Sequence, residues 1–277
     1  VRLLTMFVIA VLGFVWAFRL VGSTLPESTS PLMALLFETL RLSLSLGVAA
    51  IVSLIAIKIN FVKQEVVYNT WIAPLADFFQ RYGKRAIVLL ALIGLYRISD
   101  IVSGVISNVF YADMDFSKDE IARAVKTFGV IMSILGGFVG GVLSQRFRIM
   151  NMMMMGAITA SATNLLFALL AMRRHDIPLM YLAVGLDNLA AGLAGTVFVA
   201  FLSSLTNIRF TAVQYALFSS LMTLLPKTLG GYSGAIAGRM GYTRFFLFTS
   251  LLGIPIIFLV WLADKLLFRQ PETSVRR

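Results

Sequence analysis

Residues 86–110 read AIVLLALIGLYRISDIVSGVISNVF, and this one stretch decides the class of fold. It is long enough to cross the hydrocarbon core of a bilayer, which takes about 20 apolar residues in a helix. Arg97 and Asp100 interrupt it near its middle, and their spacing of three places both side chains on one face of a helix. Ionisable groups at such a depth are costly and are usually retained for function. The stretch therefore indicates a membrane-spanning helix with a polar face.

Apolar stretches of similar length recur along the whole chain. Of its 277 residues, 59% are hydrophobic and 13% are charged, whereas soluble domains carry about 45–50% and about 25%. Too few polar side chains remain to cover a water-soluble globule. We therefore predict an all-α integral membrane protein with eight spans, at roughly 3–21, 33–57, 86–110, 118–143, 149–172, 178–205, 211–237 and 243–267.

The residue types also exclude several classes of function. The net charge of +11 comes from Lys and Arg in short groups between apolar stretches, whereas a nucleic-acid-binding domain gathers them on one face. The chain has no cysteine and a single histidine, His175, so neither a disulfide nor a zinc site is expected. No P-loop occurs. The composition thus predicts no nucleic-acid partner, no metal, no cofactor and no enzymatic activity, with the lipid bilayer as a partner.

Lys and Arg also set the predicted orientation. Cytoplasmic loops carry an excess of these residues, and the excess falls on the correct side if both termini lie in the cytoplasm. The apolar residues of 58–85 share one helical face, which favours a helix lying flat at the membrane surface. The predicted parts are two transmembrane helices in 1–57, a cytoplasmic amphipathic linker in 58–85, a six-helix bundle in 86–268 and a cytoplasmic tail in 269–277.

A short pattern occurs twice in the six-helix part. GVLSQR at 141–146 and GAIAGR at 234–239 each end a predicted span. Each of these spans is the second of a group of three, and the two groups run in opposite directions through the membrane. This is typical of a 3+3 inverted repeat, which forms one half of a major-facilitator transporter. The predicted fold is thus a major-facilitator half preceded by two additional transmembrane helices. Ser117 and Glu120, spaced as a capping box, are expected to begin the second helix.

Five ionisable residues lie deep in the predicted spans. They are the cations Arg97, Lys126 and Lys227 and the carboxylates Asp100 and Asp187. The cations suit an anionic or zwitterionic solute in an aqueous cavity. The carboxylates suit proton coupling, because burial favours the uncharged form of an aspartate. The structural alternatives are an internal Arg97–Asp100 ion pair and a Lys126 side chain that extends to the membrane surface.

Several stretches, in the same order, resemble the AmpG-type muropeptide permeases. They are LYRISD at 95–100, VKTFG at 125–129, GGVLSQR at 140–146, DNL at 187–189, FVAFL at 198–202 and TAVQYAL at 211–217. APLADFF at 73–79 resembles the stretch before the second half of that family, so the resemblance covers the C-terminal part of a permease. Asn188 and Gln214 lie in two of these stretches. They complete the predicted substrate-binding set with Arg97, Lys126 and Lys227, and Asp100 and Asp187 are the predicted proton-coupling residues.

The resemblance implies a proton-driven importer of anhydro-muropeptides in the inner membrane of a Gram-negative cell. Such a carrier serves cell-wall recycling and, in some species, β-lactamase induction. The family also has a six-helix N-terminal half with no counterpart in this chain, so another segment or a partner is expected to supply it. Two alternatives stay open: a carrier of another anionic solute, as in the related acetyl-CoA transporters, and a non-transporting membrane remnant.

Overall fold

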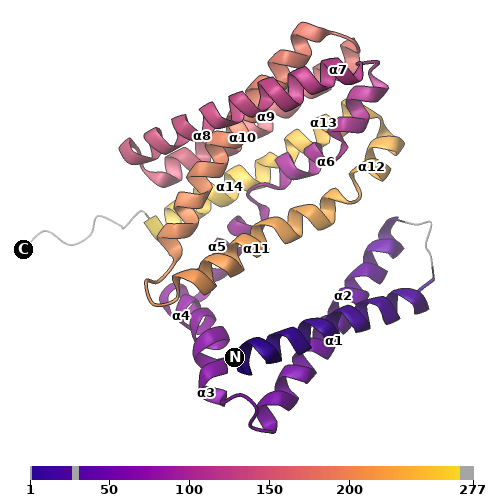
Figure 1. The fold of residues 1–277 in the computed structure, drawn as a ribbon. Helices are drawn as coiled ribbons and strands as arrows, with labels where there is room; N and C mark the ends of the chain where they lie inside the picture. The colour runs from indigo at the N-terminus through magenta and orange to yellow at the C-terminus, as the bar shows by residue number, and fades with distance from the viewer. Residues whose placement is uncertain (1, 27–30, 269–277) are drawn as a thin grey trace, which may run out of the picture. The chain divides into compact units, whose positions relative to one another are not determined.

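The computed structural model describes residues 2–26 and 31–268. The predicted cytoplasmic tail, 269–277, lies outside this part of the chain. Every regular element in the described residues is a helix, as predicted. The chain forms two compact units, Val1–Asp77 and Phe78–Arg277, which we name the hairpin unit and the bundle unit (Figure 1). The boundary between them falls inside the predicted linker.

The hairpin unit contains two long helices that pack along each other. A Cβ added at Gly13 would lie 3.4 Å from Cγ2 of Val52. The unit's small core consists of Met6, Val62 and Val67, so most of its apolar side chains are exposed, as in helices that face lipid. Its elements are α1 (Arg2–Thr24), α2 (Pro31–Lys58), α3 (Gln64–Val67), η1 (Tyr68–Ile72) and the first part of α4 (Ala73–Tyr82).

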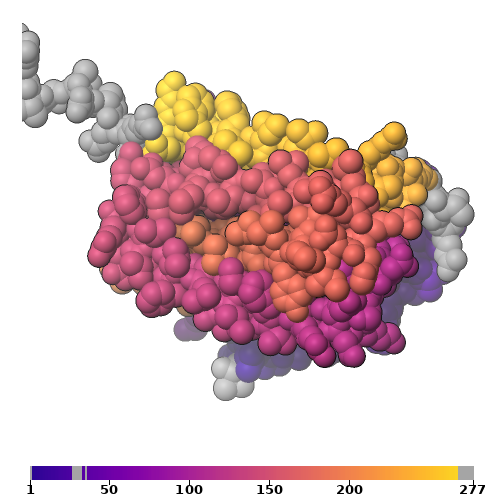
Figure 2. Space-filling model, turned by 90° about the horizontal axis from the view of Figure 1, so that it is seen from above, coloured from indigo at the N-terminus to yellow at the C-terminus, as the bar shows by residue number. Residues whose placement is uncertain are grey.

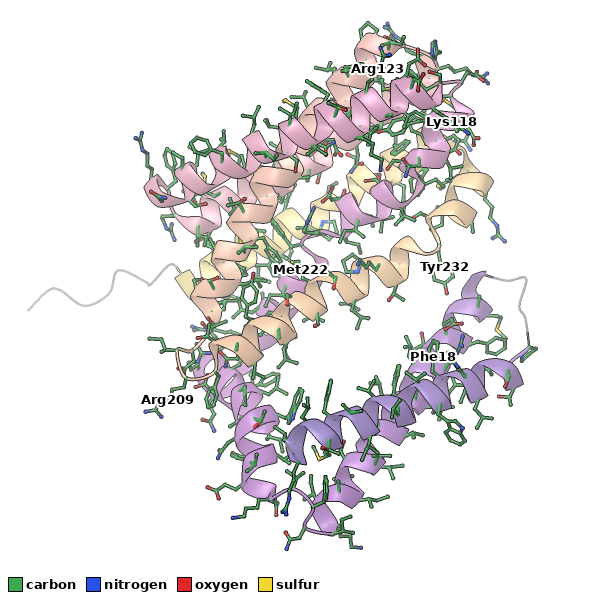
Figure 3. All side chains as sticks on the ribbon, viewed as in Figure 1. Phe18, Lys118, Arg123, Arg209, Met222 and Tyr232 are labelled. Atoms are coloured by element: carbon green, nitrogen blue, oxygen red, sulfur yellow. The ribbon has the colours of Figure 1, made fainter. Side chains whose placement is uncertain are left out.

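The bundle unit contains the six remaining predicted spans. Lys118 and Arg123 lie at one end of it and Arg209 at the other, as alternating spans require (Figure 3). Its elements, after the end of α4, are η2 (Gly83–Arg85), α5 (Ala86–Leu95), α6 (Ile98–Asp113), α7 (Lys118–Ile121), η3 (Ala122–Phe128), α8 (Gly129–Arg146), α9 (Ile149–Arg173), α10 (Ile177–Leu205), α11 (Thr211–Gly230), α12 (Ser233–Met240), α13 (Tyr242–Leu251), α14 (Gly253–Ala263) and η4 (Asp264–Phe268).

The two groups of three spans pack on each other in a reciprocal way. α8 lies along α10, and α11 lies against α5 and α6, so the second span of each group contacts the first span of the other. Likewise α9 packs on α10, while α14 packs on α5 and α13 on α6. Figure 2 shows α8 beside α10 and the C-terminal helices along α9. Each helix contact made by one group of three spans has a counterpart made by the other group. The predicted 3+3 repeat requires this correspondence.

Seven helices in the described residues are long and apolar enough to cross a membrane. The eighth predicted span, 211–237, is helical but is not among them. It is divided into α11 and α12 at Gly231 and Tyr232, and Pro226 lies inside α11. Its amide, hydroxyl and lysine side chains also lower its hydrophobicity. The sequence therefore predicted the helix correctly but missed its interruption.

Glycines allow α8 and α10 to approach closely. A Cβ at Gly136 would collide with the backbone oxygen of Leu189, and one at Gly140 would lie 2.8 Å from that of Leu193. Gly192 on α10 in turn lies against the backbone of α8. Small residues at helix contacts are the usual means of close packing in membranes. This contact holds the middle of α8 beside the middle of α10, close to the candidate site residues Asp187 and Asn188.

Candidate functional site

A polar cavity of about 220 Å³ lies within the bundle unit. Its walls come from α6, η3, α9, α10 and α13, so both groups of three spans contribute to it. Tyr111, Phe167 and Phe246 supply aromatic surface. The other polar residues that line it are Ser103, Ser107, Asn108, Lys126, Asp187 and Asn188. The cavity thus brings together three of the seven predicted site residues, namely Lys126, Asp187 and Asn188.

Asp187 is held by a neighbouring helix. Thr163 on α9 is buried, and its Oγ1 donates a hydrogen bond of 2.9 Å to Oδ1 of Asp187. Asp187 is itself half-buried, and the charges of Arg97 and Asp100 lie near enough to act on its carboxylate. Both predicted proton-coupling carboxylates therefore lie in one electrostatic cluster. Their direct partners differ, because Asp187 is bonded to a neutral hydroxyl and Asp100 to a guanidinium.

Lys126 reaches the cavity from an irregular turn of helix. It lies on η3, a π-helical segment between α7 and α8, and such wide turns occur often at functional sites. Gly129, the first residue after η3, is buried and lies against Asn188. A Cβ at Gly129 would lie 3.0 Å from Nδ2 of Asn188. The Asn188 amide donates to the backbone oxygen of Val184 at 2.9 Å. The glycine thus lets the segment that carries Lys126 approach the amide of Asn188.

The Arg97–Asp100 ion pair, which was the structural alternative to the predicted site roles of these residues, forms where a span is interrupted. α5 ends at Leu95 and α6 begins at Ile98, and Arg97 is the N-cap of α6. Nε of Arg97 donates to Oδ2 of Asp100 at 3.1 Å, and Nη2 contacts the same oxygen. The two side chains are only 28% and 16% exposed. Neither residue lines the cavity, and the charge of Arg97 is compensated within its own span.

A buried polar network extends from this interruption. The Tyr96 hydroxyl donates to the Met153 backbone at 3.0 Å. Ser99 Oγ donates to the Thr249 backbone at 2.6 Å and accepts from Nδ2 of Asn164 at 2.9 Å. These residues were absent from the predicted site. Asn164 and Thr163 are uncharged polar residues inside a predicted span. A search of the spans for all polar side chains, and not only for ionisable ones, would have found them.

Lys227 and Gln214 lie outside the cavity lining. Lys227 is exposed on α11 beside buried Pro226. Gln214 is buried, and its Oε1 accepts from the backbone N–H of Asn207 at 2.7 Å and from Nη2 of Arg81 at 3.2 Å. These contacts fix the loop between α10 and α11. Substrate binding by Lys227 and Gln214 therefore stays a prediction, and the contacts of Gln214 favour a structural role.

Metal ligation finds no support in the described residues. Within 2–26 and 31–268, no three His, Cys, Asp or Glu side chains gather in a way that could hold a metal ion. Asp187 has a hydroxyl partner and Asp100 a guanidinium partner.

The arrangement in the cavity suits a solute with carboxylate and hydroxyl groups, because it offers one ammonium, amides and hydroxyls beside aromatic surface.

Comparison with known proteins agrees with this architecture. No protein-family model matches the chain. Two relatives named "Putative transporter AmpG 4", from Rickettsia conorii and Rickettsia felis, are 32% and 30% identical over 203 and 194 residues, which is 73% and 70% of this chain. The matched part is 49% and 46% of those relatives. "Putative transporter AmpG 1" from Rickettsia bellii is 31% identical over 181 residues, which is 65% of this chain and 44% of its own length.

The match and the fold lead to one conclusion. The chain spans about half the length of the curated relatives it matches, and its described part contains several helices able to cross a membrane. The resemblance found in the sequence is confirmed. The chain is a multi-pass membrane protein related to the AmpG-type transporters over about half of their length.

Proposed function

We propose that this chain forms one half of a secondary transporter that imports an anionic solute of the anhydro-muropeptide class together with protons. The observation that carries the proposal is the polar cavity in an otherwise apolar bundle. Lys126, Asp187 and Asn188 come from two spans of opposite repeat groups and line the same cavity. Ionisable residues in such a place mark solute and proton paths in membrane proteins. The names of the relatives support transport as the activity.

Lys126 is the cation best placed to bind a carboxylate of the solute. None of the ion pairs within residues 2–26 and 31–268 involves it, whereas Arg97 is paired with Asp100. A lysine whose charge is not already neutralised retains its attraction for an incoming anion. The Lys126 side chain is exposed at the cavity lining, so an incoming anion can reach it. We therefore assign the main solute contact to Lys126 and not to Arg97.

Asp187 is the carboxylate best placed to carry the proton. Asp100 would have to break its ion pair with Arg97 in order to become neutral. Asp187 can keep a hydrogen bond with Thr163 in either state, because the hydroxyl donates to the carboxylate and can accept from the protonated carboxyl. Its position in the cavity lining also allows the solute and the proton to affect each other directly. We therefore propose Asp187 as the coupling residue.

Uptake by the complete carrier tests the substrate and the coupling. Cells that express it are given radiolabelled anhydro-disaccharide peptide, with and without an uncoupler. We expect accumulation that the uncoupler abolishes and that unlabelled anhydro-muropeptide prevents. Accumulation that survives the uncoupler would contradict proton coupling. Competition by acetyl-CoA alone would identify a different anionic solute, and a lack of any uptake would contradict transport.

We also propose that the carrier lies in the inner membrane with both termini in the cytoplasm. The distribution of Lys and Arg supports this orientation. Reporter tags placed after Arg277 and within 58–85 should both report a cytoplasmic location. A periplasmic signal from either tag would contradict this orientation, and a reversed orientation would place the Arg209 loop in the periplasm.

A further inference from the structure

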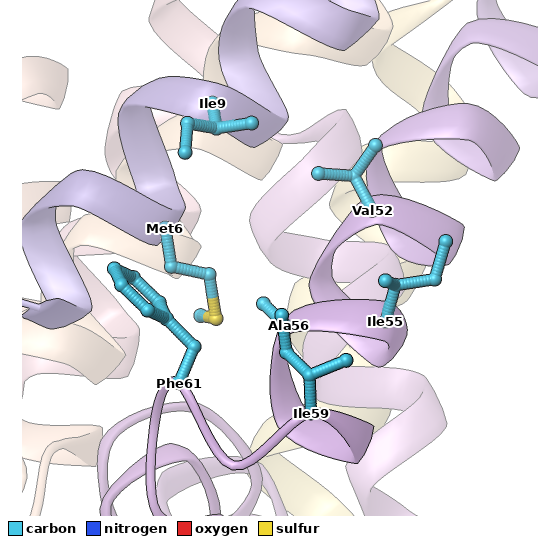
Figure 4. Close-up of a pocket in the computed structure, with 7 residues that line it drawn as sticks. All are labelled: Met6, Ile9, Val52, Ile55, Ala56, Ile59 and Phe61. Atoms are coloured by element: carbon cyan, nitrogen blue, oxygen red, sulfur yellow. The ribbon is translucent and has the colours of Figure 1, made fainter.

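Two apolar pockets lie in the hairpin unit, which the proposed transport cavity does not involve. The larger is formed by residues 6–14 of α1, 46–57 of α2 and 67–72 of the following helical segment, and its volume is about 590 Å³. We name it the hairpin groove. A smaller pocket of about 280 Å³ shares Met6 with it and is bounded by Ala56 and Phe61 (Figure 4). Both occupy the half of the hairpin nearer to Arg2 and Lys58.

The lining of the hairpin groove is almost entirely hydrocarbon. Its hydroxyl, that of Ser53, donates to the backbone oxygen of Ala49 at 2.9 Å and is therefore satisfied. Trp71 bounds the groove and stacks on Phe7 with ring centroids 6.1 Å apart. A vacant groove of this size would forfeit dispersion contacts along its walls. Between two membrane-spanning helices, an apolar chain is therefore the occupant that the walls favour.

Cations gather at the same end of the hairpin. Arg2 begins α1, Lys58 ends α2 and Lys63 is the N-cap of α3. All three side chains are exposed, and the ion pairs found in the described part of the chain do not include them. Glu65 in the first turn of α3 is the nearby acidic residue in sequence, so positive charge remains in excess. Basic residues beside a membrane-spanning helix attract anionic lipid headgroups.

We propose that the hairpin groove binds an anionic phospholipid, with an acyl chain along the groove and the headgroup phosphate at Lys58 and Lys63. The apolar walls and the cations are separate observations that point to the two chemically different ends of one molecule. A zwitterionic phospholipid fits the groove equally well. Its headgroup also carries a positive charge, which offsets the attraction to the lysines, so the cations select the anionic lipid.

Quenching of Trp71 fluorescence by brominated lipids tests the proposal on the full chain. Trp16→Phe and Trp261→Phe leave Trp71 as the single tryptophan. The protein is reconstituted in vesicles that mix unlabelled lipid with brominated phosphatidylglycerol or brominated phosphatidylcholine. We expect the groove to bind phosphatidylglycerol more tightly than phosphatidylcholine. The ratio of the two affinities should be about fivefold for each lysine that contacts the headgroup. Lys58→Gln with Lys63→Gln should reduce the preference to about one.

Two further variants separate the occupant from general effects of charge and folding. Lys84→Gln with Arg85→Gln removes the same charge from the bundle unit and should leave the preference of the groove unchanged. Ala50→Phe should lower quenching by both lipids, because Ala50 lines the groove. Equal quenching by both lipids before any lysine is changed would overturn the proposal, and this comparison requires no lysine variant to fold. If neither brominated lipid quenches Trp71, the groove is filled by protein and the proposal is wrong.

Discussion

The hairpin unit and the bundle unit differ in the continuity of their helices. α1 and α2 run without interruption for 23 and 28 residues. In the bundle unit, α5 and α6 are separated at Tyr96–Arg97, α11 and α12 at Gly231–Tyr232, and α13 and α14 at Leu252. Another span contains π-helical η3. Irregular backbone at membrane depth is tolerated only inside protein or beside a water-filled cavity. The interruptions therefore indicate that the bundle unit encloses polar contents, whereas the uninterrupted α1 and α2 of the hairpin unit face hydrocarbon.

The positions of the ionisable residues follow the same division. Arg97 lies at the first interruption, Lys126 lies on η3, and Lys227 precedes the division between α11 and α12 by a single turn. Broken helices of this kind form the binding sites of many secondary transporters, because the freed backbone groups and adjacent charges face the solute. Variants that change one unit and leave the other intact can therefore test the contrast.

The largest effect is expected from Asp187→Asn, which keeps the size of the side chain and removes its charge. Proton-driven accumulation by the complete carrier should be abolished, at least about a hundredfold lower, because the coupling site is lost. Counterflow should continue, since exchange of solute needs no net proton movement. Radiolabelled uptake and counterflow in the same vesicles measure both.

Asp119→Asn is the matched control for this change. Asp119 is exposed in the first turn of α7, and its substitution should leave both activities unchanged. Normal accumulation by Asp187→Asn would remove this residue from coupling. Asp100, despite its ion pair with Arg97, would then become the candidate.

Lys126→Gln is expected to have the next largest effect. A charge-assisted contact contributes about 1.5–3 kcal/mol, so the affinity for an anionic peptide should fall about tenfold to a hundredfold. Lys227→Gln should have a smaller effect, because Lys227 does not line the cavity of the bundle unit. Competition binding with peptides of different charge measures both. Lys118→Gln, at the exposed start of α7, is the control. A larger loss from Lys227→Gln would move the anion site to the exposed face of α11.

Several features of the bundle unit could be predicted from the sequence because they depend on local spacing. The apolar lengths predicted the spans. The spacing of Arg97 and Asp100 predicted that they share a helical face, and the ion pair that forms there is the structural alternative to their predicted site roles. The capping box is also confirmed, since Ser117 and Glu120 bond each other's backbone N–H groups. Each of these interactions joins residues within one helix, whose geometry fixes their relative positions.

Features that join distant residues could not be predicted in this way. Thr163 on α9 bonds Asp187 on α10, and Arg81 on α4 bonds Gln214 on α11. Both contacts depend on how the helices are rotated about their axes, and the spans of this bundle are apolar on most sides. The repeat motif indicated the pairing of the helices but not their rotation. This is why the contact between Thr163 and Asp187 could not be predicted, although Thr163 itself is a polar residue inside a predicted span.

A moderate effect is expected where α8 meets α10. Gly136→Ala places a methyl group against the backbone oxygen of Leu189, and overpacking of this kind lowers the free energy of unfolding by about 1–3 kcal/mol. Gly195→Ala is the matched change on α10, since a Cβ there has no atom within 4 Å. It should be neutral or stabilising by about 0.5–1 kcal/mol. Unfolding titrations in mixed micelles distinguish the two, and equal effects would contradict the close approach of these helices.

The smallest effect is expected for the ion pair of the hairpin unit. Nη1 of Arg41 lies 3.0 Å from Oε1 of Glu38, with the same spacing of three as Arg97 and Asp100. The Glu38 side chain is 53% exposed. Arg41 also donates through Nε to the Phe18 backbone at 2.7 Å, and its guanidinium carbon lies 3.7 Å from the centre of the Phe18 ring. Arg41 therefore has partners that do not depend on Glu38.

Glu38→Gln should for this reason lower the free energy of unfolding by about 0.5 kcal/mol or less, as is usual for an exposed pair. Asp100→Asn removes a carboxylate that is only 16% exposed and leaves the partly buried Arg97 without its acidic partner. Loss of one partner is far more destabilising at a buried pair than at an exposed one. The same micelle titration measures both variants. Equal losses would show that the depth of the two pairs does not distinguish them. A clear difference would mean that the bundle unit, unlike the hairpin unit, depends on charge compensation inside its spans.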